Sequence, residues 1–250
     1  MALPSTLSSA RNQDRIEAAR NRLIVALDVA TADDASALVD RLEGTCPWFK
    51  VGLELFTAAG PGIVERLAKR GHSVFLDLKF HDIPNTVAGA VRSAASLGAQ
   101  MMTVHALGGP AMLAAARAEL AKLSNPPELL AVTVLTSMDA VQLTAIGVGM
   151  SPAEEAQRLA RLGCAAGMRG FVCSPHEVTA LRSITGPEGV LVVPGIRPSG
   201  VALGDQKRVA TPAEALRQGA SYLVVGRPIT QAADPVAAAS EILAEMAEAC

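Results

Sequence analysis

The stretch LIVALDVATADD, residues 23–34, is an apolar run that ends in Asp28 and continues without a glycine. A strand that is continuously apolar is buried on both faces, as in a parallel sheet covered by helices. A doubly wound sheet that binds dinucleotides often carries a glycine-rich turn directly after its first strand. That turn is absent here, so the stretch favours another arrangement of parallel strands.

Short apolar runs of the same kind recur along the whole chain. We count eight of them, at residues 23–28, 48–52, 73–80, 101–106, 129–137, 170–174, 190–195 and 222–226. Between them lie segments rich in alanine, leucine and charge, and several of these open with Ser, Thr or Asp before Pro and close with Gly, as helices do. Eight such units favour a (β/α)8 TIM barrel over a doubly wound sheet, which usually has fewer strands.

The chain shows no linker or repeat that would divide it. We therefore predict one barrel domain over residues 1–250, with an extra helix at residues 11–21 before the first strand and a flexible extension at residues 1–10. Half of the residues are apolar, so a large core is available.

Charge and cysteine content exclude several classes of protein. Charged residues make up 18% of the chain and the formal net charge is −2, so we expect neither a nucleic-acid partner nor binding to a membrane surface. No apolar run approaches the roughly 20 residues of a membrane span, and the N-terminal segment lacks the apolar core of a secretion signal, so we expect a cytoplasmic protein. The four cysteines form no CxxC pair and no zinc spacing, which predicts neither a disulfide nor a metal site.

Charged residues stand at the ends of the first three predicted strands. Asp28 closes the first, Lys50 lies in the second, and Asp77 and Lys79 end the third. Reacting groups of such barrels lie where strands end, and residues two apart in a strand project to the same face. An ion pair kept for stability is one interpretation, but buried pairs are weak stabilisers. We prefer an Asp/Lys array that presents a carboxylate and a proton-donating ammonium to a substrate.

The loops after the seventh and eighth predicted strands have the composition of an anion site. They read PGIRPSGVALGDQKR (194–208) and VGRPIT (225–230), and they contain Arg197, Gln206, Gly226 and Arg227. Barrels often bind phosphate with these two loops, arginine forks bind its oxygens in pairs, and glycine lets the backbone approach closely. We therefore predict a phosphate site rather than two solvated surface charges, with residues 196–208 as a lid.

Five short motifs together resemble those of a known family. They are DLKFHDIPNT (77–86), LTS (135–137), PGIRP (194–198), GDQKR (204–208) and GRPI (226–229). In order and spacing they are similar to orotidine 5'-phosphate decarboxylase of the bacterial type, from Leu23 to about Pro235. The resemblance implies a barrel that converts orotidine 5'-monophosphate to UMP and CO2 in de novo pyrimidine biosynthesis, without a metal or an organic cofactor.

The resemblance also implies roles for individual residues. Lys79 would protonate C6 of the pyrimidine, Asp77 would face the departing carboxylate, and Lys50 would hold Asp77. Asp82 would cross a homodimer interface and complete the partner's site. The implied substrate contacts are Asp28, Lys50 and Thr86 near the ribose, Thr136 and Ser137 at the pyrimidine, Arg197, Gln206, Gly226 and Arg227 at the phosphate, and Pro194.

Two other hypotheses stay open. One is a magnesium-dependent sugar-phosphate decarboxylase or a hexulose-phosphate synthase of the same suprafamily, which share the Asp-x-Lys-x-x-Asp pattern. These enzymes tend to carry a metal-binding Glu where this chain has Lys50, and a cation there repels Mg²⁺. The other is a non-catalytic nucleotide-binding barrel, which has no need to bury Asp77 beside a carboxylate-bearing ligand. His81 and His105 receive no role from the sequence.

Overall fold

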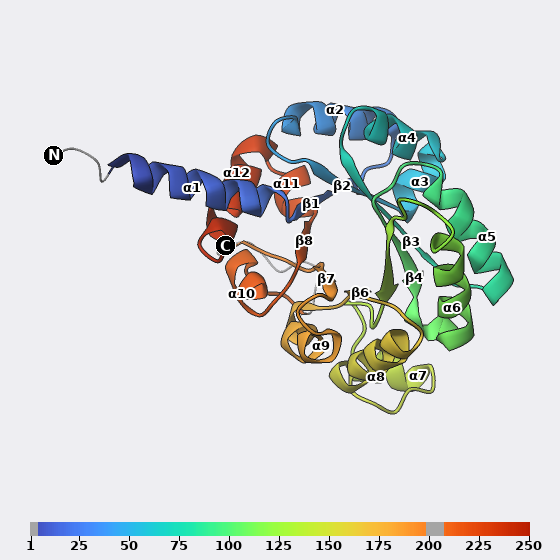
Figure 1. Ribbon diagram of the computed structural model, residues 1–250. Coiled ribbons are helices and arrows are strands. Elements are labelled where there is room, and N and C mark those ends of the chain that lie inside the picture. The colour runs from blue at the N-terminus through green and yellow to red at the C-terminus, as the bar shows by residue number, and fades with distance from the viewer. Residues whose placement is uncertain (1–4, 199–207) are drawn as a thin grey trace.

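The computed structural model describes residues 5–198 and 208–250, with side chains from residue 12 onward in those ranges. In this part of the chain, eight parallel strands close into a barrel in sequence order, with β8 paired to β1 (Figure 1). The strands are β1 Leu23–Ala26, β2 Trp48–Gly52, β3 Ser73–Phe80, β4 Met101–His105, β5 Glu128–Val132, β6 Gly170–Val172, β7 Val190–Val193 and β8 Tyr222–Val225. The predicted TIM barrel is confirmed.

Helices form the outer ring of the barrel (Figure 1). In chain order they are α1 Ser5–Arg20, α2 Ala32–Leu42, α3 Leu53–Ala59, α4 Gly62–Lys69, α5 Pro84–Ala95, α6 Gly109–Leu120, α7 Ala140–Ala145, α8 Pro152–Ala165, α9 Val178–Thr185, α10 Pro212–Arg217, α11 Arg227–Thr230 and α12 Pro235–Ala247. Two 3-10 turns, η1 Ala106–Gly108 and η2 Pro175–Glu177, precede α6 and α9. Among the helices described, none is long and apolar enough to cross a membrane.

Side-chain caps determine where several helices begin. Ser151 and Thr211 each accept the main-chain N–H of the third helical residue, and Glu154 and Glu214 bond back to the cap. These reciprocal bonds satisfy N–H groups that have no partner inside the helix. Proline follows both caps at the first helical position, where a missing N–H costs nothing.

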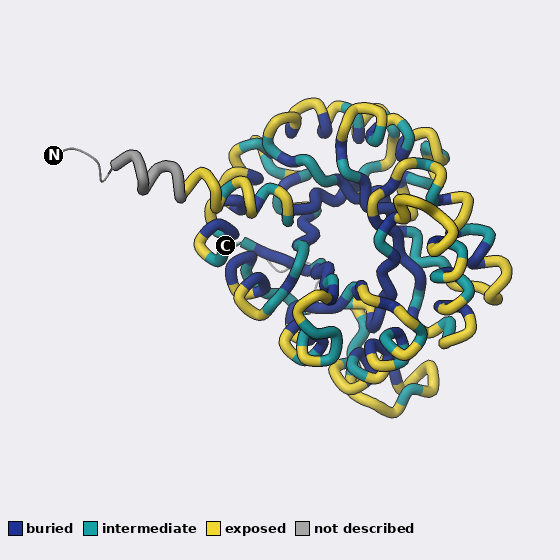
Figure 2. Tube along the Cα trace, viewed as in Figure 1, coloured by how far each residue is buried: buried dark blue, intermediate teal, exposed yellow. Residues whose placement is uncertain are grey.

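Apolar side chains pack on both faces of the sheet. Alternate residues of a strand point to opposite faces, so each strand contributes to the barrel interior and to the layer beneath the helices. Figure 2 shows the buried strands enclosed by helices whose outer sides are exposed. The inner cluster consists of Ile24, Ala26, Phe75, Met101, Leu130, Val192 and Val224. This cluster fills the barrel, so polar residues at the carboxyl ends of the strands lie above a packed floor.

The N-terminal helix differs from its prediction. It begins at Ser5 rather than at residue 11, and residues 1–4 lie outside the described residues. Helix α1 packs against α12 at the side of the barrel (Figure 1). The fifth strand also ends earlier than predicted, at Val132, so the residues up to 137 form a loop.

Candidate active site

Four charged side chains of alternating sign meet at the carboxyl ends of β1, β2 and β3. Lys50 Nζ lies 2.9 Å from Asp28 Oδ1 and 3.8 Å from Asp77 Oδ2. Lys79 Nζ donates to the same Asp77 oxygen at 2.8 Å. The order Asp28, Lys50, Asp77, Lys79 is therefore a continuous series of ion pairs, which we call the charged array. The structure brings these four predicted residues together.

Strand register and a glycine make room for Lys50. Ala26 pairs with Lys50, and Gly52 pairs with Asp77, so three neighbouring strands deliver their charges to one mouth of the barrel. A Cβ atom built on Gly52 would lie only 2.8 Å from Lys50 Nζ. Gly52 therefore leaves the space that the ammonium occupies, a role that the sequence analysis does not identify.

The sequence predicts that Asp77 and Lys79 share a face of a regular strand. In the structure they meet through an irregular part of β3 instead. Opposite β4, the register of β3 jumps from Leu76 to Phe80, so three residues face Thr103 alone. Within this bulge Lys79 has φ 51°, the left-handed region, and it is the one non-glycine residue with positive φ in the part of the chain described. The Lys79 N–H donates to Thr103 Oγ1 at 2.8 Å, and that hydroxyl donates to Asp77 Oδ1 at 3.0 Å. Thr103 is a site residue that the sequence analysis misses.

The charged array is buried at its centre and open at its ends. The side chains of Lys50 and Asp77 are each 11% exposed, whereas that of Asp28 is 55% exposed. Two formal positive and two formal negative charges cancel, which makes burial tolerable. Asp28 and the half-buried Lys79 are the members that a ligand in the mouth reaches most directly.

One arginine follows β7 and another follows β8, Arg197 and Arg227. Arg197 is buried and donates through Nη1 to the carbonyl oxygen of Ile196 at 2.8 Å. Its burial, followed by the positive charge of Arg227, lowers the pKa of Arg197. A bound anion would counter both effects. Gly226 places this region against the charged array, because a Cβ on that glycine would lie 3.5 Å from Asp28 Oδ2.

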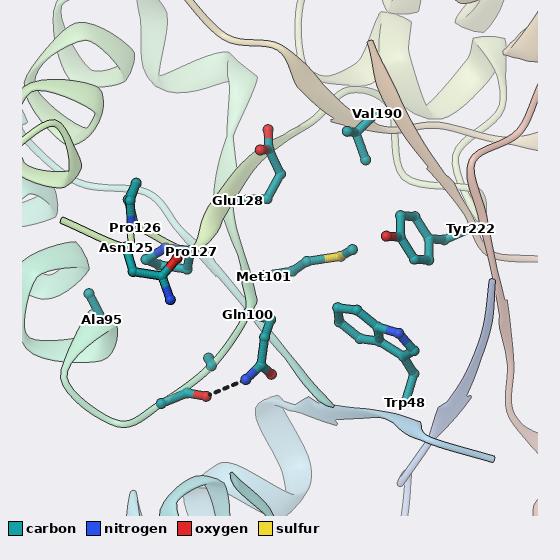
Figure 3. A pocket seen from close by; sticks show the side chains of 12 residues that line it. Trp48, Ala95, Gln100, Met101, Asn125, Pro126, Pro127, Glu128, Val190 and Tyr222 are labelled. Atoms are coloured by element: carbon teal, nitrogen blue, oxygen red, sulfur yellow. Dashed lines mark hydrogen bonds between the residues drawn. The ribbon is translucent and has the colours of Figure 1, made fainter. Parts of the chain in front are cut away.

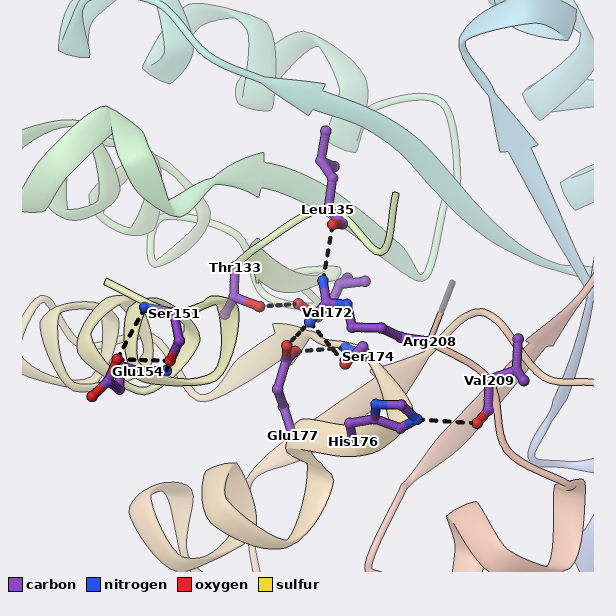
Figure 4. Close-up of polar contacts among 10 residues, drawn as sticks. All are labelled: Thr133, Leu135, Ser151, Glu154, Val172, Ser174, His176, Glu177, Arg208 and Val209. Atoms are coloured by element: carbon purple, nitrogen blue, oxygen red, sulfur yellow. Dashed lines mark hydrogen bonds and ion pairs between the residues drawn. The ribbon is translucent and has the colours of Figure 1, made fainter. Parts of the chain in front are cut away.

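Arg208 holds the loop that follows β5 (Figure 4). It donates through Nη2 to the carbonyl oxygen of Leu135 at 2.9 Å and through Nη1 to Ser174 Oγ at 3.2 Å and to the carboxylate of Glu177. Glu177 is buried, and its second oxygen accepts the N–H of Ser174 at 2.9 Å. This network joins the ends of β5 and β6 to Arg208, the last residue of the predicted lid.

The remaining predicted substrate contacts differ in exposure. Thr136 is half-buried and Ser137 exposed in the loop held by Arg208, and Pro194 is half-buried directly after β7. Gln206 lies outside the described residues, as do positions 199–207 of the predicted lid.

Comparison with known proteins identifies relatives over almost the whole length. The sequence model of the Orotidine 5'-phosphate decarboxylase / HUMPS family matches residues 21–242. The chain belongs to this family. It is 55% identical over 234 residues to orotidine 5'-phosphate decarboxylase of Moorella thermoacetica, covering 91% of this chain and 93% of that protein. The corresponding enzyme of Halorhodospira halophila is 55% identical over 228 residues, covering 91% and 97%.

A solved structure of the family agrees in fold. The crystal structure of orotidine 5'-phosphate decarboxylase from Lactobacillus acidophilus matches with a TM-score of 0.79 and 39% sequence identity. The match covers 90% of this chain and 98% of that one.

In this family member, Asp82 and Thr86 face solvent in the single chain. Asp82 lies in the loop between β3 and α5, where its Oδ1 accepts the N–H of Ile83 at 2.6 Å. Thr86 is exposed in the first turn of α5. The side chain between them, Ile83, is 66% exposed although it is large and apolar.

Two histidines stack beside the charged array. The rings of His81 and His105 lie 5.4 Å apart with an interplanar angle of 23°. Burial, followed by the charges of His81 and Lys79, lowers the pKa of His105 to about 4. His105 is therefore neutral near pH 7, and its Nδ1 accepts the N–H of Leu107 at 3.4 Å, which caps η1. His105 is a packed, hydrogen-bonded wall residue.

A separate cavity of about 480 Å³ lies at the opposite end of the barrel (Figure 3). Four residues that begin strands point into it, namely Trp48, Met101, Glu128 and Tyr222. Burial raises the pKa of Glu128 there. The cavity is separated from the charged array by the packed interior, so it takes no part in the candidate active site.

The thiols and the acidic groups give no sign of metal chemistry in the residues described. Burial raises the pKa of Cys46 and of Cys173 to about 12, so both thiols stay protonated. Within residues 5–198 and 208–250, no group of three His, Cys, Asp or Glu side chains is placed to hold a metal ion.

Proposed function

We propose that this family member converts orotidine 5'-monophosphate to UMP and CO2, the last step of de novo pyrimidine synthesis, in the cytoplasm and without a metal or organic cofactor. The observation that carries the proposal is the charged array, in which a lysine nitrogen lies 2.8 Å from a buried carboxylate at the barrel mouth. The relatives named orotidine 5'-phosphate decarboxylase support the choice of substrate.

The reaction uses Lys79 as both electrostatic stabiliser and proton donor. When the bond from C6 to the carboxylate breaks, CO2 leaves and the electron pair stays on C6. A fixed ammonium stabilises this developing charge more than it stabilises the substrate, which is the condition for catalysis. Lys79 then gives one proton to C6 and regains it from solvent.

Asp77 faces the substrate carboxylate, and Lys50 keeps Asp77 in place. The Asp77 side chain is held at Oδ2 by Lys79 and lies 3.8 Å from Lys50 Nζ. A second carboxylate brought beside it is repelled, and this repulsion ends when CO2 leaves. Binding energy from the distant phosphate offsets the unfavourable contact.

Phosphate and base are bound at opposite sides of the array. Arg197, Arg227 and the backbone at Gly226, together with Gln206, bind the phosphate. The positive charge of Arg227, which lowers the pKa of the buried Arg197, supports this assignment. Thr136 and Ser137 contact the pyrimidine, Asp28 and Lys50 contact the ribose hydroxyls, and Pro194 lines the site.

The active unit is a homodimer in which Asp82 and Thr86 reach the partner's site. Support comes from three exposed apolar side chains, Leu53, Ile83 and Leu107, which follow the neighbouring strands β2, β3 and β4. Exposed large apolar residues around one rim are typical of an interface, and a second copy of the chain covers them by two-fold symmetry.

An absorbance assay with orotidine 5'-monophosphate and excess chelator tests the proposal. We expect full activity with chelator, because Lys50 replaces the metal-binding residue of the magnesium-dependent alternative. Lys79→Ala should lower kcat by at least about 1,000-fold while UMP still binds. The control Lys122→Ala removes an exposed ion pair with Glu119 and should leave kcat unchanged. Activity that disappears with chelator, or a Lys79→Ala variant with normal turnover, contradicts the proposal.

Mixing two inactive variants tests the shared site. A dimer of one Asp82→Ala chain and one Lys79→Ala chain contains one intact site and one site with both defects. Random exchange of equal amounts should therefore restore about a quarter of the wild-type activity. Heterodimers that form but show no recovery would argue against Asp82 crossing the interface.

A further inference from the structure

Thr103 carries a buried hydroxyl group that lies between apolar residues. It lies in the middle of β4, between Met102 and Val104, and has no exposed surface. A buried hydroxyl is costly unless both its donor and its acceptor capacity are used. The partners of Thr103 are the two members of the charged array that belong to β3, Asp77 and Lys79.

The backbone of Lys79 adopts an unusual, left-handed conformation. A φ of 51° is uncommon for any residue with a side chain, and lysine has no short polar group that favours it. Such conformations persist where the surrounding structure enforces them, and they gather at functional sites. Here the bulge in β3 faces Thr103, whose hydroxyl accepts the Lys79 N–H at 2.8 Å.

The same hydroxyl orients the catalytic carboxylate. A threonine hydroxyl has a single proton to donate, and because it accepts from the Lys79 N–H, that proton is directed to Asp77 Oδ1 at 3.0 Å. Oδ1 is thereby fixed on Thr103, and Oδ2 is left for Lys79 Nζ at 2.8 Å and Lys50 Nζ at 3.8 Å.

We propose that Thr103 is a positioning residue that sets, through one hydroxyl, both the strained backbone of Lys79 and the rotation of the Asp77 carboxylate. This inference rests on the proposed roles of Lys79 and Asp77 in decarboxylation. Thr103 is fully buried beneath the pair, so it acts through them and not on the substrate. Its removal should therefore reduce kcat, while nucleotide affinity, supplied by other loops, changes little.

Thr103→Val tests the proposal, because it keeps the shape of the side chain and removes the hydroxyl. We expect kcat to fall about 30- to 100-fold with KM within about threefold of wild type, as for small misplacements of reacting groups. Thr103→Ser restores the hydroxyl and should recover kcat to within about threefold. Thr133→Val is the matched control, since Thr133 is also fully buried but donates to the carbonyl oxygen of Val172; it should keep kcat within about threefold.

A second measurement is independent of turnover. Hydrogen exchange of the Lys79 amide should be at least about tenfold faster in Thr103→Val than in the wild type, and unchanged in Thr133→Val. If Thr103→Val does not fold, Thr103→Cys, a weaker donor and acceptor of similar size, takes its place with at least about tenfold lower kcat.

The outcomes separate this inference from the proposed function. A folded Thr103→Val variant with normal kcat, a Thr103→Ser variant as impaired as Thr103→Val, or an equal loss in Thr133→Val overturns the positioning role. A Lys79→Ala variant with normal turnover overturns the proposed function instead, whatever the Thr103 variants do.

Discussion

Replacing Lys50 by methionine removes the one side chain of the charged array that lies between both carboxylates. Lys50 Nζ is 2.9 Å from Asp28 and 3.8 Å from Asp77, and its side chain is largely buried. Methionine has a similar length and no charge, so the change removes the ammonium and keeps most of the volume of the side chain. In the variant, Asp77 retains Lys79 and Thr103 but loses its second cation.

The structure gives the size of the expected effect. At 3.8 Å and an effective dielectric constant of about 20, the attraction between Lys50 and Asp77 is about 4 kcal/mol. We take about half of it as lost, because two other groups still hold Asp77. Asp28 adds at most about 1 kcal/mol, since its side chain is 55% exposed and therefore screened. The sum, about 3 kcal/mol, predicts that kcat/KM falls about 150-fold.

Initial rates of orotidine 5'-monophosphate consumption, followed by absorbance, measure this ratio, and thermal unfolding confirms that the variant is folded. Lys69→Met is the control, because Lys69 pairs with Glu65 on α4 but its side chain is 77% exposed, so kcat/KM should stay within about twofold. The electrostatic reasoning is refuted if folded Lys50→Met stays within about threefold of wild type, or if Lys69→Met loses as much.

Three further predictions concern the surroundings of the array. Gly52→Ala places a Cβ 2.8 Å from Lys50 Nζ and should lower kcat/KM about tenfold, whereas Gly62→Ala, with open space around its Cβ, should not. Folding lowers the pKa of His105 from 6.5 to about 4, so the unfolded chain binds this proton first as pH falls. The free energy of unfolding of the wild type, measured in urea, should therefore decrease as the pH is lowered from 6.5 to about 4. His105→Gln should show a smaller decrease. Arg208→Lys keeps the charge but loses the fork that holds the loop after β5, which we propose contacts the pyrimidine, so KM should rise at least about fivefold, and an unchanged KM would show that the fork is dispensable.

Most of the fold follows from local pattern. All eight predicted strands begin within one residue of the observed ones, because a strand buried on both faces is continuously apolar and its start is marked by that change. Strand ends were less predictable where apolar residues continue into a buried loop, as after Val132.

The candidate site also contains some residues that the sequence predicts and others that only the fold reveals. Residues such as Asp28, Lys50 and Asp77 were predictable, because charges at the ends of buried strands are conspicuous and parallel strands deliver them to one mouth. Thr103 was not, because a threonine inside an apolar run is an ordinary β-strand residue and nothing in the local sequence reveals the bulge opposite it. The contact between Arg208 and Leu135 joins positions far apart in the chain, and only the fold shows it.

The alternation of charge in the array is better explained by chemistry than by stability. Ion pairs buried in this way rarely stabilise a protein more than apolar packing would, and replacing them with apolar residues of similar volume is often neutral or stabilising. The formal charges of the array, however, sum to zero, so the array carries no unbalanced charge before a substrate binds. In the proposed reaction, a substrate carboxylate adds a negative charge beside Asp77, and loss of CO2 transfers that charge to a carbon beside Lys79, so the nearest charged group changes from negative to positive. Because these two residues lie only 2.8 Å apart, the negative charge moves from an unfavourable to a favourable neighbour without any movement of the protein. The fixed geometry of this pair, rather than the number of charges, is therefore the property on which the proposed reaction depends.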